Sequence, residues 1–291
     1  MNDEFRSDDL EARQRAIVAS PSYVLAEKDV HFLALPELRP VRMQLELLKP
    51  EMALAEHKVA STIVLFGGTQ IVGRDQAQAR LALAESALAA APGDARAARD
   101  VDRARRILAK CHHYDAAREF ARLVTAAGQQ EGTIHYVVMT GGGPGIMEAG
   151  NRGAADAGGK SIGLNVVLPA EQKPNPYITP ELCFQFHYFA MRKLHFLLRA
   201  KALIAFPGGF GTLDELFDAL TLRQTHSMQE LPIILFGREY WRHVVDFQFL
   251  ADEGVIADEH LRLIDYAETP REAWEIIARF HAARGAPHGD A

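Results

Sequence analysis

Short, nearly continuous apolar runs alternate with longer stretches of helical spacing along most of this chain. The runs that predict buried strands lie at residues 61–66, 135–139, 161–168, 183–188, 202–206 and 232–236. Helical patterns fill several of the intervals, at 145–157, 189–200 and 212–226. Strands without polar alternation, separated by helices, are typical of a parallel sheet covered on both faces. We therefore predict an α/β fold whose ligand binds at the carboxyl ends of the strands.

The first 55 residues depart from this alternation. Charged residues with spaced apolar positions at 4–19 and 35–54 predict helices. Three prolines are expected to break them: Pro36, Pro40 and Pro50. We expect residues 1–55 to form an N-terminal helical extension that packs on the body of the protein or on a partner subunit.

A second departure is the Ala- and Arg-rich stretch at residues 74–128. Pro92-Gly93-Asp94 divides it into two helices, and the second is broken near His112. We treat this stretch as a helical insertion in a single domain at residues 56–291.

Composition narrows the classes of protein. The 291 residues are 48% hydrophobic, enough for a sizeable core. The net charge of −6 suggests no basic surface for nucleic acid. Two cysteines favour a reducing compartment, and no apolar run approaches the roughly 20 residues that span a bilayer. We expect a cytoplasmic protein with no nucleic-acid or membrane partner.

Candidate chemistry lies in three glycine turns, at residues 67–69, 140–148 and 205–215, each of which follows a predicted strand. Glycine allows a ligand to approach the backbone closely. A single turn of this kind is usually an ordinary connection between a strand and a helix. Three turns at one edge of one sheet instead indicate a binding site.

The third turn is the most informative. Pro207 and three glycines lead from a buried strand into a helix that begins near Thr212. Free N–H groups and the helix dipole make such a turn an anion site. Glu215, one turn inside the helix, would repel the anion unless it acts on a neighbouring part of the ligand. The pattern therefore predicts a phosphorylated substrate with chemistry next to the phosphate.

Two familiar phosphate motifs do not fit. A dinucleotide fingerprint beginning at Gly141 or Gly143 ends on Ile146 or Glu148, where glycine is required. The run Gly158-Gly159-Lys160-Ser161 resembles the end of a Walker motif but leads from a helix into a strand. We therefore set aside NAD binding and ATP hydrolysis.

Three of these segments resemble the LOG family, the cytokinin-activating phosphoribohydrolases once labelled possible lysine decarboxylases. Residues 207–215 read PGGFGTLDE and fit its PGGxGTxxE motif, and Met191-Arg192-Lys193 fits its arginine-lysine pair. The run at 141–147 is similar to its GGGxxGLM loop, one residue shorter here, and Gly67-Gly68-Thr69 stands at its first glycine turn. The resemblance covers about residues 60–250.

The resemblance implies a Rossmann-like fold and a homodimer or larger homo-oligomer. It implies cofactor-free and metal-free hydrolysis of the N-glycosidic bond of a nucleoside 5′-monophosphate, AMP or an N6-modified AMP, to free base and ribose 5-phosphate. Residue by residue, it implies that Arg192 and Glu215 are catalytic. The substrate-binding residues that it implies are Gly68, Thr69, Gly142, Gly143, Met191, Lys193, Gly208, Gly209, Phe210, Gly211 and Thr212.

The insertion and the extension are absent from short plant-like members of the family. They are similar to longer bacterial members, some of which resemble AMP nucleosidases. The preferred base therefore stays open.

The residues suit the implied chemistry. Breaking the bond builds positive charge on the ribose, which a carboxylate at Glu215 would stabilise while it positions water. Arginine is a poor proton donor because its pKa exceeds about 12. Arg192 is therefore expected to hydrogen-bond the leaving base or to orient Glu215. Asp214 is the alternative carboxylate, and we expect it at the surface or in a helix cap.

Two other functions stay open. A fold of this type can carry a phosphorylated ligand without cleaving it, as relatives resembling molybdenum-cofactor carriers do. A decarboxylase would need pyridoxal phosphate on a lysine, for which Lys193 and Lys201 are candidates by residue type alone.

Overall fold

The computed structural model describes residues 7–130, 132–167 and 173–284, which divide into two compact units at Met1–Leu48 and Lys49–Ala291. The predicted strand end at position 168 and the tail after 284 lie outside the described residues. No described helix is long and apolar enough to cross a membrane.

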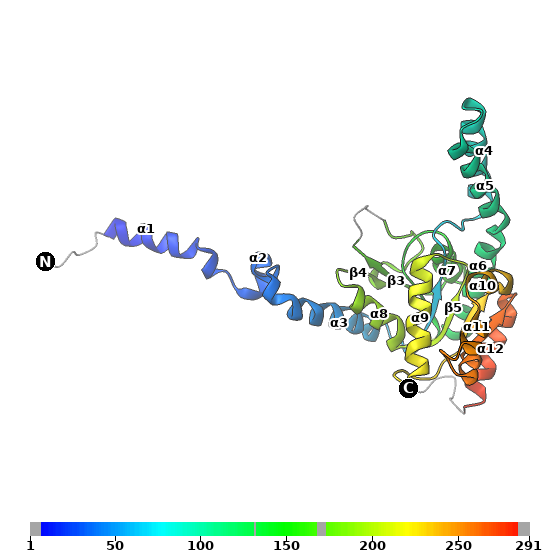
Figure 1. The fold of residues 1–291 in the computed structure, drawn as a ribbon. Coiled ribbons are helices and arrows are strands. Elements are labelled where there is room, and N and C mark those ends of the chain that lie inside the picture. Colours follow the sequence, from blue (N-terminus) through cyan, green and yellow to red (C-terminus); the bar gives the residue numbers. More distant parts are fainter. Residues whose placement is uncertain (1–6, 131, 168–172, 285–291) are drawn as a thin grey trace. The chain divides into compact units, whose positions relative to one another are not determined.

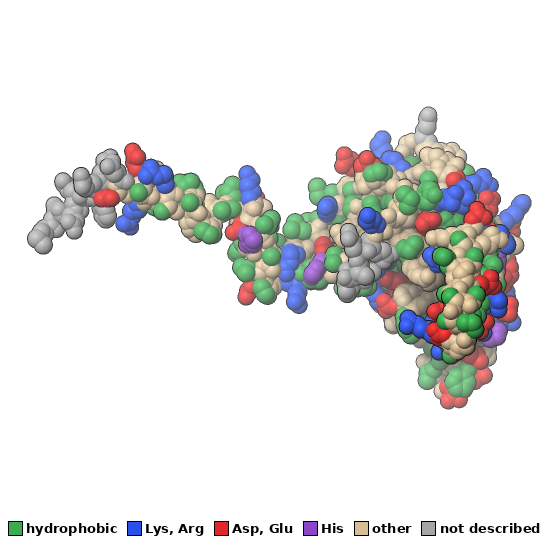
Figure 2. Space-filling model, turned by 90° about the horizontal axis from the view of Figure 1, so that it is seen from above, with side chains coloured by type: hydrophobic (Ala, Val, Ile, Leu, Met, Phe, Trp, Pro, Cys, Tyr) green, Lys and Arg blue, Asp and Glu red, His purple; other side chains and the backbone are tan. Residues whose placement is uncertain are grey.

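The first unit is helical. Its elements are α1 (Ser7–Val18), η1 (Pro21–Tyr23), η2 (Ala26–Lys28), α2 (Val30–Leu33), η3 (Pro36–Leu38) and the first part of α3 (Arg39–Glu56). None of its side chains described from residue 9 onward is buried, and hydrophobic side chains lie on its surface (Figure 2). The unit therefore has no apolar core of its own.

Pro50 does not break the chain as the sequence suggested, because it lies inside α3. Proline lacks an N–H, so the helix loses the bond to the carbonyl of Glu46 but continues. Pro50 and Leu54 are the buried residues of this helix, so packing maintains the helix where the local preference would end it.

The second unit is built around a seven-stranded sheet. Its strands are β1 (Thr62–Phe66), β2 (Val137–Thr140), β3 (Ser161–Val166), β4 (Cys183–Phe186), β5 (Ala200–Ala205), β6 (Ile233–Phe236) and β7 (Ile264–Ala267). Their order is β4-β3-β2-β1-β5-β6-β7, and every neighbouring pair is parallel. The prediction of a Rossmann-like α/β fold is confirmed.

The centre of the sheet is β1, which pairs with β2 on one side and with β5 on the other. The chain builds outward from β1 to β4, then returns to the other side of β1 and builds outward again. Such a reversal leaves a crevice at the carboxyl ends of the central strands. All three glycine turns follow strands that meet there.

Helices cover both faces of the sheet (Figure 1). On one face lie α6 (Cys111–Gly128), α7 (Ile146–Asp156) and α12 (Pro270–Ala282). On the other lie α8 (Phe189–Leu198), α9 (Phe210–Gln224), α10 (Arg238–Val244) and α11 (Phe247–Asp252). Alternate residues of β1 enter the two cores, Ile63 and Leu65 on the first face and Val64 and Phe66 on the second.

The insertion contains three helices, where the sequence predicted two with a break in the second. α4 (Arg74–Ala90) and α5 (Ala95–Ala109) form a hairpin that extends from the sheet, and α6 begins after Lys110 (Figure 1). Asp94 caps α5 by accepting hydrogen bonds from the N–H groups of Arg96 and Ala97.

One strand was missed. None of the apolar runs identified in the sequence lies after residue 236, but β7 pairs with β6 at the edge of the sheet. Its four residues include Asp265 and Tyr266, so no continuous apolar run marks it. η5 (Asp258–Leu263) precedes it, and η4 (Pro180–Leu182) leads into β4.

A buried polar network fixes the second glycine turn. The side-chain oxygen of Asn151, Oδ1, accepts hydrogen bonds from Thr140 Oγ1 at 2.7 Å and Asn175 Nδ2 at 2.9 Å. Its amide nitrogen donates to Ser161 Oγ at 3.0 Å and to the Ile162 carbonyl at 3.3 Å. This fully buried side chain therefore joins α7 to β2, to β3 and to the segment after β3.

We expect Asn151→Ala to lower the free energy of unfolding by about 2–4 kcal/mol, because it leaves several buried polar groups without partners. Urea denaturation measures the change. The control is Gln248→Ala, which removes an exposed hydrogen bond and should change stability by less than about 0.5 kcal/mol. Equal, small effects of the two substitutions would contradict a structural role for the network.

Candidate active site

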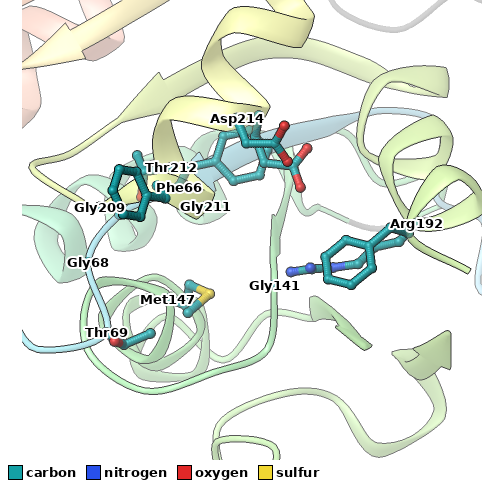
Figure 3. Close-up of a pocket in the computed structure, with 14 residues that line it drawn as sticks. Phe66, Gly68, Thr69, Gly141, Met147, Arg192, Gly209, Gly211, Thr212 and Asp214 are labelled. Carbon is teal, nitrogen blue, oxygen red and sulfur yellow. The ribbon is translucent and has the colours of Figure 1, made fainter. Parts of the chain in front are cut away.

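A pocket of about 330 Å³ lies at the carboxyl ends of β1, β2 and β5 (Figure 3). A volume of this size suits a small ligand. Its described lining residues are Phe66, Gly67, Gly68, Thr69, Gly141, Met147, Phe189, Arg192, Gly209, Phe210, Gly211, Thr212, Asp214 and Glu215.

The amino terminus of α9 forms one side of the pocket. Gly209 is its N-cap residue, and no side chain caps the helix. The first N–H groups of a helix have no partner within it, so those of residues 210–212 remain available to an anion. Gly208 precedes them, and a β-carbon there would lie 2.0 Å from Thr212 Oγ1. The loop can close against Thr212 only because Gly208 has no side chain.

Glu215 lies one turn further along α9 and faces the same pocket. It is 9% exposed, and its carboxylate forms no hydrogen bond or ion pair with the residues that the structure describes. Burial raises the pKa of Glu215 to about 7, although the charges of Arg192 and Lys193 act in the opposite direction. The carboxyl group can therefore gain or lose a proton near neutral pH.

Arg192 enters the pocket from α8 and points toward Gly141 (Figure 3). Its Nε donates a hydrogen bond to the Leu164 carbonyl at 2.8 Å. Its guanidinium carbon lies 6.0 Å from the ring centroid of Phe189 and 5.2 Å from that of Phe196. A backbone carbonyl and two aromatic rings thus fix the side chain, while its outer nitrogens are directed to the pocket.

Gly141 leaves the space that Arg192 needs. A β-carbon at this position would lie 2.5 Å from Arg192 Nη2 and 2.8 Å from Met147 Sδ. A larger residue would displace both side chains. The second glycine turn therefore contributes to the site chiefly through the absence of a side chain.

The first and second turns are in direct contact. The N–H of Ile146, the first residue of α7, donates to the Gly68 carbonyl at 3.2 Å. Gly145 has a φ of 73° and packs so closely on Gly68 and Thr69 that no β-carbon would fit. The amino terminus of α7 is thereby held against the loop that follows β1.

The pocket brings together both residues implied to be catalytic and six of those implied to bind substrate. These six are Gly68, Thr69, Gly209, Phe210, Gly211 and Thr212. The other five lie outside the pocket lining: Gly142, Gly143, Met191, Lys193 and Gly208. Gly142 and Gly143 use their carbonyls to accept hydrogen bonds from Asn175.

Met191 packs against the core on its side of the sheet, and Gly208 accepts a hydrogen bond from the Tyr240 hydroxyl at 2.5 Å. Lys193 turns away to α9, where its Nζ lies 2.9 Å from Asp214 Oδ1 and 2.7 Å from Asp218 Oδ2.

Asp214 was expected at the surface or in a cap, and it is exposed; it also borders the pocket and pairs with Lys193. Sequence reasoning also missed Met147 and Phe189, which follow the second turn and begin α8. Their position as the first side chains after a strand end or loop is a signal that could have identified them. Phe66 and Gly67 could have been found in the same way, at the end of β1.

The pocket does not suit a cofactor bound to lysine. None of its described lining residues is a lysine, and Lys193 is held by two carboxylates outside it. Within the described ranges, no three His, Cys, Asp or Glu side chains are grouped as metal ligands. The available groups are helix N–H donors, one guanidinium and two carboxylates.

Glu215→Gln should alter how stability depends on pH. A raised pKa means that the folded state keeps a proton that the unfolded state loses near pH 4.5. This contribution is full below that pH and is lost as the pH rises through about 7, by roughly 3 kcal/mol at most. Glutamine resembles the protonated acid and does not ionise, so Glu215→Gln should not lose this stability as the pH rises.

Denaturation at pH 5 and pH 8 tests this expectation. The variant should gain stability relative to the wild type as the pH rises, and the matched control Glu181→Gln, at an exposed position, should not. A constant difference between Glu215→Gln and the wild type would contradict the raised pKa.

Comparisons with known proteins agree with the glycine motifs. The model of the family described as "Possible lysine decarboxylase" matches residues 147–277. A pyrimidine/purine nucleotide 5′-monophosphate nucleosidase of Escherichia coli K12 is 32% identical over 161 residues, which cover 50% of this chain and 35% of the relative. The chain thus spans about a third of the length of that relative.

A second relative is the cytokinin riboside 5′-monophosphate phosphoribohydrolase LOG of Oryza sativa subsp. japonica. It is 30% identical over 167 residues, which cover 56% of this chain and 65% of the relative. A molybdenum cofactor binding protein of Rippkaea orientalis has a solved structure that is 23% identical, covers 58% of this chain and 87% of its own, and gives a TM-score of 0.41. A likeness that low says nothing about what this chain binds.

The matched segment contains α7, Arg192 and the whole third glycine turn. Over residues 147–277, this chain is similar to the family whose model is described as "Possible lysine decarboxylase", which agrees with the resemblance of its motifs to the LOG family.

Proposed function

We propose that this protein hydrolyses the N-glycosidic bond of nucleoside 5′-monophosphates and releases the free base and ribose 5-phosphate. One observation carries the proposal: the buried carboxylate of Glu215, which has no partner among the described residues, shares a pocket with Arg192. It lies one turn beyond a glycine-rich helix terminus whose N-cap residue has no capping side chain. The names of the relatives from E. coli and rice support the same reaction class.

The 5′-phosphate would bind at the amino terminus of α9. The N–H groups of residues 210–212 and the Thr212 hydroxyl supply donors, and the helix dipole favours negative charge. The glycines let the phosphate oxygens reach the backbone. Anchoring the phosphate here directs the ribose toward the next turn of the helix.

Glu215 would then face the anomeric carbon. As the C1′–N bond breaks, its electron pair goes to the base nitrogen and positive charge develops on the ribose. An ionised Glu215 stabilises that charge and accepts a proton from the water that attacks C1′. The water oxygen becomes the new hydroxyl group of ribose 5-phosphate, and the proton is passed to the base or to solvent.

Arg192 would act on the leaving base. Its guanidinium is held by the Leu164 carbonyl and by two aromatic rings, so it needs little reorganisation as charge develops. Burial lowers the pKa of Arg192. Arginine nevertheless stays charged at neutral pH and does not supply a proton. Hydrogen bonding to the anionic base is therefore its role.

The base would lie near Phe189 and Met147, which contribute an aromatic ring and a thioether to the lining. Both groups favour a flat ligand without reading its hydrogen-bonding edge. The E. coli relative is named for purine and pyrimidine nucleotides, and the rice relative for a cytokinin nucleotide. We infer that AMP is the suitable first substrate and that other bases should also be accepted.

Glu215→Gln should reduce the release of adenine from AMP by at least about a thousandfold, because it removes the group that stabilises the cation and activates water. Chromatography of the products measures it. AMP binding should persist, since glutamine removes only a like charge from the anion site. The control Glu181→Gln should retain full turnover. Normal turnover by Glu215→Gln would refute the role, and AMP binding without adenine release by the wild type would favour a carrier.

The pH dependence of kcat/KM should reflect Glu215. The reaction needs the ionised carboxylate, so kcat/KM should rise with pH through a midpoint near 7. The second ionisation of the substrate phosphate occurs near about pH 6 and is expected as a separate step. A profile already flat above pH 5 would contradict the assignment.

A further inference from the structure

Lys193 stands next to Arg192 on α8 but does not line the pocket. Its Nζ lies 2.9 Å from Asp214 Oδ1 and 2.7 Å from Asp218 Oδ2. These two carboxylates are four residues apart on α9, so they face the same side of that helix. The three side chains join the helix that carries Arg192 to the helix that carries Glu215.

The pair of carboxylates holds Lys193 firmly. The Lys193 side chain is only 24% exposed. Burial alone would lower its pKa, but the hydrogen bonds to Asp214 and Asp218 raise it above the usual value. The ammonium group is therefore fixed in its charged form between the two helices.

Glu215 lies immediately after Asp214 on α9 and has no hydrogen-bond partner among the described residues. Burial has the largest effect on the ionisation of Glu215, and the fixed charges around it adjust that effect. Arg192 and Lys193 face it from α8 and favour the carboxylate, whereas Asp214 and Asp218, on its own helix, oppose it. The first and second glycine turns contribute only uncharged residues to the described pocket lining.

We propose that Lys193 is a positioning residue that, through its ion pairs with Asp214 and Asp218, ties α8 to α9 and favours the ionised form of Glu215. It balances two negative charges that would otherwise act on Glu215, and it adds a positive charge of its own. The inference rests on the proposed function, and it differs from the role of substrate ligand that the resemblance implies for Lys193.

The sign of each substitution follows from this charge balance. Lys193→Met leaves Asp214 and Asp218 without a counter-charge and should move the midpoint of Glu215 upward by about half a unit to one unit. Asp218→Asn removes one opposing charge and should move the midpoint downward. Lys193→Arg retains the charge and can donate to both carboxylates, so it should restore the wild-type midpoint.

The experiment measures AMP binding by calorimetry from pH 5 to pH 9 on the full chain, alongside adenine release. The phosphate of AMP titrates equally with every variant, so differences between variants report on the protein. Glu215→Gln is the reference without the titrating group, and combining it with Lys193→Met should leave AMP binding unchanged. Lys110→Met is the lysine control, at a residue between α5 and α6 that is not in the described pocket lining.

Opposite shifts for Lys193→Met and Asp218→Asn, with near-normal turnover on the alkaline plateau, would support the proposal. Loss of AMP binding by Lys193→Met in the Glu215→Gln background at every pH would overturn it, because Lys193 would then be a direct ligand. An unshifted midpoint would overturn it as well.

The design separates this proposal from the proposed function. If no variant and no wild-type protein released adenine, the reaction would be wrong, yet the binding midpoints would still test the charge balance. If Lys193→Met failed to fold, the downward shift of Asp218→Asn and the unchanged midpoint of Lys193→Arg would still test the proposal.

Discussion

The pairing of β1 with β2 on one side and β5 on the other is the constraint on which the site depends. Parallel strands present their carboxyl ends at one edge, and the reversal of strand order at β1 separates the connections that leave it. Loops distant in sequence, at residues 67–69, 141–145 and 207–209, thus meet around one hollow. Without the central position of β1, the glycine turns would be three unrelated connections.

Within that hollow, a helix terminus with a glycine N-cap and a carboxylate lie one helical turn apart on α9; under the proposed function, the terminus is the anion site. A phosphate bound at the helix terminus and the Glu215 carboxylate would repel each other. A ligand that places its electron-poor carbon at Glu215 offsets this repulsion. Two positive charges on α8 offset these negative charges: Arg192 faces the pocket, and Lys193, outside it, pairs with Asp214 and Asp218. The arginine-lysine pair is therefore two neighbouring residues with separate tasks.

The sequence was sufficient for the parallel sheet, because β1, β2, β3, β5 and β6 are continuous apolar runs that few other structures accommodate. It was not sufficient for β7, whose short, half-polar sequence depends on pairing with β6. At Pro50 the sequence predicted a break that the structure does not have, because tertiary packing keeps α3 continuous there.

The site followed the same division. Glu215 and Arg192 could be identified because each belongs to a sequence motif. The direction in which a side chain leaves its helix could not be predicted. Lys193 and Asp214 illustrate this limit: the resemblance implies that Lys193 binds substrate and the sequence places Asp214 at the surface, and only the structure reveals that the two side chains form an ion pair.

The absence of a side chain at Gly141 limits the substitutions that this position can accept during evolution. Any side chain there would push on Arg192 and Met147 together, so this position is closed to change while the arginine is needed. Phe189 lies at the exposed rim and has no such restriction. For the proposed hydrolysis, preference for one base over another could therefore change by substitutions at Phe189, while Gly141 and Arg192 would be conserved together.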